Sequence, residues 1–198
     1  MNRLYKWYKW GRSKINFTPA PFIMLFASTV WALPPAGEVV SGSATITQPN
    51  NASLQINQHS NKTIINYSQF SIGEGELVRF IQPDVKSIVL NRVTGSDVSE
   101  IFGQLQANGQ VFLVNPNGIV FAPGSQVDVG GLVATTLDVK DSDFIAGNYH
   151  FSQTDGAQTE VINQGRLKAI PEGYIALFAT KVTNEGTIQA DLGHVALV

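Results

Sequence analysis

Short runs of alternating apolar and polar residues follow one another along the chain, and most are bounded by Asn, Gly, Pro, Ser or Asp. Alternation with a period of two predicts half-buried β-strands, and the bounding residues favour turns. The expected strands cover residues 44–47, 53–57, 63–67, 77–81 and 87–93. Helical periodicity is missing from every long window, although residues 98–106 could hold one helical turn. The pattern therefore predicts an all-β protein.

The C-terminal part of the chain contains an internal repeat. Residues 161–169 match residues 182–190 at an offset of 21, and residues 173–177 match residues 193–197 at an offset of 20. Residues 105–113 look like an earlier copy of the 161–169 unit. Self-similarity at a fixed period near 20 residues is typical of a solenoid. We expect a parallel β-helix with about two strands per coil, and an ordinary β-sandwich is the alternative.

The repeat also predicts which side chains point inward. Alternate residues of an extended segment share one face, so Leu167 should stack on Ile188 and Asn163 on Asn184 in the next coil. Stacked Asn side chains can bond to each other inside a solenoid. The apolar positions expected to be buried are Val111, Leu113, Ile119, Ile175, Leu177, Val195 and Leu197.

The N-terminus has the pattern of a secretory signal peptide. Five basic residues lie within residues 3–14, no acidic residue precedes Glu38, and an apolar stretch covers residues 21–32. This stretch is short for a membrane span of ~20 residues, so cleavage between Ala32 and Leu33 is favoured over a membrane anchor. We expect a signal peptide at residues 1–32 and one domain at residues 33–198, with the polypeptide continuing beyond Val198.

Composition narrows the function. The chain has 198 residues, of which 43% are hydrophobic and 14% charged, as in a globular domain. Cleavage would remove five of the 13 basic residues and none of the 15 acidic ones, which leaves a formal charge of −7. An acidic domain without a basic patch argues against a nucleic-acid partner. The chain has no cysteine, which is compatible with late folding after export.

The centre of the chain carries a distinctive turn, Asn115-Pro116-Asn117-Gly118, between the apolar segments 111–114 and 119–121. Proline fixes φ, and Asn-Gly is a strong tight-turn signal. These residues and Ile119 should form a rigid corner between two buried strands. The corner is either purely structural or part of a surface that a partner recognises.

Residues 103–121, with the flanking segments 89–95 and 130–136, resemble the N-terminal secretion domain of filamentous haemagglutinin-type proteins. These are the exported members of two-partner secretion systems, and Asn115–Ile119 matches their Asn-Pro-Asn-Gly-Ile motif. A second Asn-Pro-type motif, which many relatives carry upstream, is absent. The resemblance implies a right-handed parallel β-helix with an N-terminal cap and a small extra-helical sheet.

The resemblance also implies the partners and the destination. The Sec machinery would export the chain, a cognate outer-membrane transporter with periplasmic domains would recognise it, and folding would begin outside the cell. Regions beyond this chain could contact a host or a neighbouring cell. The protein would be secreted across the outer membrane of a Gram-negative bacterium and remain extracellular or at the cell surface.

Other kinds of site are poorly supported. His59, His150 and His194 lack metal-ligand spacing, and Asp141-Ser142-Asp143 is expected to be a solvated turn. We expect no cofactor and no catalytic residue. A lyase-like enzyme would need acidic and basic residues converging on one groove, and the sequence shows no such cluster at repeat spacing. A direct adhesin or carbohydrate-binding β-helix is the stronger alternative to a secretion domain.

Overall fold

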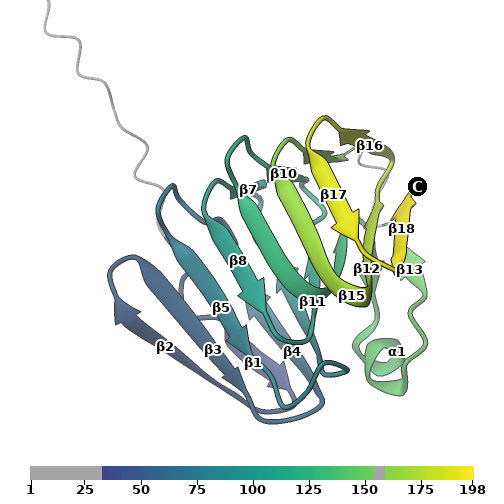
Figure 1. Cartoon of the computed structure of the whole chain (residues 1–198). Helices are drawn as coiled ribbons and strands as arrows, with labels where there is room; N and C mark the ends of the chain where they lie inside the picture. Colours follow the sequence, from purple (N-terminus) through teal and green to yellow (C-terminus); the bar gives the residue numbers. More distant parts are fainter. Residues whose placement is uncertain (1–32, 154–158) are drawn as a thin grey trace, which may run out of the picture.

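The computed structural model describes residues 33–153 and 159–198, so the expected signal peptide lies outside the described residues. The chain winds into stacked coils whose parallel strands form three faces of a β-helix (Figure 1). The strands of the first face are β3 (Ser53–Gln58), β5 (Leu77–Ile81), β8 (Gln104–Ala107), β11 (Gln126–Thr135), β15 (Arg166–Phe178) and β17 (Thr187–Ala190).

The other two faces complete each coil. The strands β11 and β15 are long and bend into the second face, where β11 pairs with β9 and β15 with β18. The other strands of the second face are β4 (Lys62–Tyr67), β6 (Ile88–Val93), β9 (Gln110–Val114) and β18 (His194–Leu197). The third face consists of β7 (Ser99–Ile101), β10 (Ile119–Phe121), β14 (Glu160–Asn163) and β16 (Lys181–Asn184).

The register confirms the expected stacking. Leu167 pairs with Ile188, and Asn163 pairs with Asn184. The Asn163 Nδ2 donates to Asn184 Oδ1 at 2.7 Å, so the predicted amide ladder is present. The 21-residue repeat is therefore one coil of a parallel β-helix, and the β-sandwich alternative is wrong.

Columns of apolar side chains fill the interior of the coils. In-register residues form one such column, and all are 4% exposed or less: Leu54, Val78, Leu105, Val127 and Leu167. Removing each of these side chains from water contributes about 1.5–3 kcal/mol before the entropy cost of folding is counted. The interior is thus a continuous core that holds neighbouring coils together.

Glycine recurs where neighbouring coils come closest. A Cβ at Gly193 would collide with the carbonyl oxygen of Gly173, and one at Gly186 would collide with that of Gly165. Likewise, a Cβ at Gly130 would meet the backbone of Gly109. These steric limits explain why glycine is repeated at two positions of each late coil.

Residues 38–50 close the N-terminal end of the β-helix. The strand β1 (Glu38–Ser41) pairs antiparallel with β4, and β2 (Ala44–Asn50) pairs antiparallel with β3. Leu33, the first described residue, is 8% exposed and belongs to the core cluster. This arrangement confirms the expected N-terminal cap.

A side excursion, residues 138–152, leaves the coils and packs on the outside of the second face. It contains β12 (Asp138–Val139), α1 (Asp141–Ala146) and β13 (Phe151–Ser152), and its two strands form a separate antiparallel sheet. Phe144 of α1 is fully buried in a second apolar cluster with Ile64, Leu90 and Phe112. The expected extra-helical sheet is therefore present, and this second core lies outside the coils.

Several local expectations are wrong. Residues 98–106 hold β7 and the start of β8 instead of a helical turn, and residues 141–143 begin α1 instead of forming a solvated turn. The expected match between residues 105–113 and 161–169 is also shifted. It placed Leu105 opposite Val161, but in the structure Leu105 is in register with Val127, which is in register with Leu167.

Two of the seven expected core residues are exposed. Val195 is 49% exposed and Leu197 46%, whereas the other five are buried. Both belong to β18, which pairs with β15 on one side only. Their side chains therefore lack the second neighbouring coil that covers the equivalent residues Ile175 and Leu177.

Candidate functional site

The turn at residues 115–118 connects β9 on the second face to β10 on the third face. The Gly118 N–H donates to the carbonyl oxygen of Asn115 at 3.1 Å, which closes a four-residue turn around Pro116 and Asn117. Gly118 has a φ of 119°, a backbone angle that residues other than glycine rarely adopt. Asn117 does not have a positive φ, so within Asn-Gly the glycine alone supplies the left-handed geometry.

The Asn115 side chain points into the molecule and is fully buried. Its Nδ2 donates to the carbonyl oxygen of Asp97 and to Ser99 Oγ, each at 2.9 Å. Its Oδ1 accepts bonds from the Asn117 N–H at 2.9 Å and Asn117 Nδ2 at 3.0 Å. This side chain therefore ties the corner to the preceding coil and has no surface available to a partner.

The exposed part of the corner comes from two coils. Pro116 and Asn117 are partly exposed, and Asn117 Nδ2 also donates to the Gly95 carbonyl oxygen at 2.8 Å. Asp97 is exposed and Val98 is 40% exposed on the adjacent coil. We call Asp97, Val98, Pro116 and Asn117 the corner patch. Ile119 lies in the core and contributes nothing to this surface.

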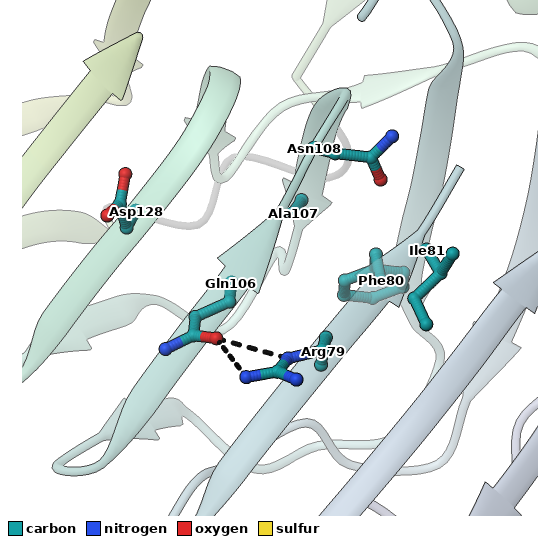
Figure 2. Close-up of a pocket in the computed structure, with 7 residues that line it drawn as sticks. All are labelled: Arg79, Phe80, Ile81, Gln106, Ala107, Asn108 and Asp128. Atoms are coloured by element: carbon teal, nitrogen blue, oxygen red, sulfur yellow. Dashed lines mark hydrogen bonds between the residues drawn. The ribbon is translucent and has the colours of Figure 1, made fainter. Parts of the chain in front are cut away.

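A second feature is a groove of about 520 Å³ on the outside of the first face (Figure 2). Arg79 donates from Nε and Nη2 to Gln106 Oε1 at 3.1 and 2.8 Å. The residues that line this first-face groove are Arg79, Phe80, Ile81, Gln106, Ala107, Asn108 and Asp128.

This face holds a pairing that the repeat in the sequence did not reveal. Asp128 is in register with Lys168 on the next strand and with Gln106 on the preceding one. Asp128 and Lys168 therefore do lie side by side on neighbouring coils, although they are 40 residues apart in sequence and not at the repeat spacing. The sequence comparison missed them because Lys168 was aligned only with the following coil, where Gln189 occupies its position.

The structure does not bring the three histidines together as a site. Within residues 33–153 and 159–198, no group of three or more His, Cys, Asp or Glu side chains could hold a metal ion. No helix in the same described part of the chain is long and apolar enough to cross a membrane.

Two cations anchor the side excursion, and sequence patterns gave no sign of them. Arg92 is paired with Asp138 at 2.9 Å and with Asp141 at 2.6 Å. Burial lowers the pKa of Arg92, but the bonds to Asp141 and Asp138 more than offset this, so its pKa is raised overall. Lys62 donates to the carbonyl oxygens of Phe144 and Ile145 at the end of α1. The partners of Arg92 and Lys62 all lie 46 or more residues away in the chain, so no local motif in the sequence could reveal these contacts.

The fold defines a capped parallel β-helix with a side excursion, and comparison with known proteins gives the family. Residues 33–198 match the model of the TPS secretion domain, where TPS stands for two-partner secretion. The chain belongs to this family.

Solved and curated relatives agree with the family match. The HMW1 secretion domain from Haemophilus influenzae has a TM-score of 0.75 and 38% identity, over 78% of this chain and 41% of that one. A Heme/hemopexin-binding protein from Haemophilus influenzae is 38% identical over 188 residues, covering 89% of this chain and 20% of the relative. The chain thus spans about a fifth of that relative's length.

A more distant relative is named Protein adenylyltransferase and cysteine protease IbpA, from Histophilus somni. It is 27% identical over 156 residues, which make up 72% of this chain but 4% of that protein. In the Heme/hemopexin-binding protein and in IbpA, the similarity to this chain is therefore confined to a small part of a much longer polypeptide. The parts of this chain that they match lie largely within the region that matches the secretion-domain family.

Proposed function

We propose that this chain directs the export of a large surface protein by presenting a surface that a partner outer-membrane transporter recognises. The family match over residues 33–198 carries the proposal. In it, the Sec machinery delivers the chain to the periplasm, and residues 1–32 are removed in the course of this export. The transporter then moves it across the outer membrane, and the capped coils nucleate β-helix folding outside the cell.

Within this function, we assign recognition to the corner patch and a structural role to Asn115. The turn is rigid because proline fixes one φ and because Asn115 bonds it to the preceding coil. A rigid surface loses little entropy on binding. Val98 adds an exposed apolar side chain close to Gly118 of the turn, and removing such a side chain from water on binding is favourable.

The name of the Haemophilus relative does not extend this proposal. Its binding of heme and hemopexin belongs to a protein of which the matched part is 20%. We assign neither activity to any residue of this chain. Adhesion, toxin delivery or iron acquisition would depend on regions outside it, including any contact with a host or neighbouring cell.

Substitutions in the exposed part of the corner test the recognition role. Val98→Ser and Pro116→Ser alter the corner patch without opening the core. We expect secretion with the co-expressed transporter to fall about tenfold or more, while the melting temperature moves by only a few degrees, about 2–4 °C per kcal/mol for a domain of this size. Immunoblotting of the culture medium and thermal denaturation of purified protein measure the two effects.

Two controls separate recognition from stability. Val85→Ser changes a 54% exposed valine between β5 and β6, and we expect normal export. Leu113→Ala removes a buried side chain at a cost of about 2–5 kcal/mol without changing the corner patch. Normal export of both corner variants would reject the recognition role, as would a strict correlation of export with melting temperature across all four variants.

A further inference from the structure

The first-face groove is built from equivalent positions of successive coils. Arg79, Gln106, Asp128 and Lys168 are in register on β5, β8, β11 and β15. Neighbouring parallel strands lie ~4.8 Å apart, so these side chains form a row along the axis of the β-helix. A smaller hollow of about 100 Å³ adjoins the first-face groove and shares Asp128 with it. Lys168 lines this hollow, together with Gln126, Val127 and Arg166.

Positive charge is concentrated on this face of an acidic domain. Residues 33–198 contain eight basic and 15 acidic residues, yet three of the basic ones, Arg79, Arg166 and Lys168, lie here. Asp128 on β11 and Glu172, at the bend of β15, are the two acidic residues among the described strand residues of the first face, so the three basic residues outnumber them. The local charge is therefore opposite in sign to that of the domain, and it favours an anionic ligand.

The polar side chains of the groove are held in place before any ligand binds. Gln106 accepts both bonds from Arg79 and in turn donates to Gln104 Oε1 at 3.1 Å. The remaining guanidinium nitrogen of Arg79, Nη1, points away from Gln106 (Figure 2). Pre-ordered donors lose less entropy on binding than free side chains.

The residue types narrow the ligand class. Phe80 lines the groove but is 1% exposed, so ring stacking on a sugar face cannot supply the affinity. A guanidinium fits the planar geometry of a carboxylate. Asp128 would repel a uniformly charged polyanion, but it can accept hydrogen bonds from hydroxyl groups. We propose that the first-face groove and the adjoining hollow together bind a carboxylated oligosaccharide along the β-helix axis, with carboxylates near Arg79 in the groove and Lys168 in the hollow, and a hydroxyl on Asp128.

Calorimetric titration of the whole exported chain tests this proposal with three oligosaccharides of equal length. These are an oligogalacturonate, a sulfated dextran fragment that has no carboxylate, and a neutral maltooligosaccharide. We expect saturable binding of oligogalacturonate that weakens with added salt and is at least about tenfold tighter than binding of the neutral sugar. A preference for the sulfated dextran would overturn the assignment to carboxylates. Equal or absent binding of all three would overturn the site.

Three variants locate the ligand and separate it from general charge attraction. The double variant Arg79→Gln and Lys168→Gln should lose at least about tenfold in affinity, whereas Lys86→Gln, an exposed lysine in the turn before β6, should not. Asp128→Ala should also weaken binding, because a hydroxyl partner is lost. Tighter binding by Asp128→Ala would reduce the groove to a simple cationic surface and refute the proposal.

The groove and the corner patch have independent tests. The groove lies on the first face, whereas the corner patch lies between the second and third faces. The double groove variant should therefore be secreted like the unmodified chain. Loss of its secretion would assign these residues to export instead of to saccharide binding.

Discussion

Buried amides at the bends of the coils satisfy the backbone where the strands stop. Gln82 is 4% exposed; its Nε2 donates to Gln58 Oε1 and the Ser87 carbonyl, and its Oε1 accepts from the Gly109 N–H. Asn163 and Asn115 fill the same role at other corners. The repeat in the sequence predicted the Asn163 ladder, since Asn recurs one coil later. It could not predict the direction of Asn115, because an isolated Asn in a turn can bond to its own loop or to another coil.

Replacing Asn115 by Ala should destabilise the domain more than an ordinary turn substitution would. The change leaves the Asp97 carbonyl, the Asn117 N–H and the buried Ser99 hydroxyl without this partner, and such losses cost about 1–3 kcal/mol. The melting temperature should fall by roughly 2–12 °C, at 2–4 °C per kcal/mol. Asn57→Ala, which removes one bond from Gln55 to a partly exposed Asn, is the control. Equal shifts for the two variants would show that the buried bonds of Asn115 contribute little.

At the scale of elements, the coils were predictable and the side excursion was not. Alternation located five early strands, and the repeat located the pairs in the last two coils, because both signals depend on side chains that face one core. The six residues of α1 span fewer than two turns, too few for helical periodicity to be visible. The helix forms because Phe144 packs against the outer face of β6 and β9 and because Lys62 bonds its last carbonyl groups.

Removing Arg92 should loosen the side excursion without unfolding the coils. Arg92→Met deletes the bonds to Asp138, Asp141 and the Val139 carbonyl but keeps much of the side-chain volume. Arg92 is only 13% exposed, although its partners are 37% and 53% exposed, so we expect a loss of about 1–3 kcal/mol after allowing for solvent screening. In the variant, the Phe144 amide, which bonds the Lys140 carbonyl, should exchange its hydrogen faster than it does in the unmodified protein. The Leu105 amide, inside the coils, should not show this increase.

An exposed ion pair provides the comparison for Arg92. Lys181 pairs with Glu160 at 2.7 Å, but the lysine is 70% exposed. Lys181→Met should therefore change stability by less than about 1 kcal/mol and leave exchange in α1 unchanged. If Arg92→Met leaves the Phe144 amide as protected as in the unmodified protein, apolar packing of Phe144 alone holds the excursion.

The whole molecule is a stack whose members each depend on their neighbours. Residues far apart in sequence meet only through the coil period, which explains why the sequence predicted the solenoid but misplaced the phase of residues 105–113. Charge divides the chain into the same two parts as the proposed cleavage. The basic residues at 3–14 precede an acidic domain at 33–198. The domain boundary that we propose between Ala32 and Leu33 coincides with the start of the family match.

Cleavage between Ala32 and Leu33 can be tested on exported protein. Leu33 is 8% exposed in the core cluster, so the mature domain would begin with a residue that anchors its own N-terminus. N-terminal sequencing of secreted material should therefore start at Leu33. Signal cleavage requires a small residue before the cut, so Ala32→Lys should leave an uncleaved, cell-associated form. Ala36→Lys, which adds the same charge at an exposed position four residues later, should be processed normally. Secreted protein that retains Met1, or that starts well beyond Leu33, would contradict this boundary.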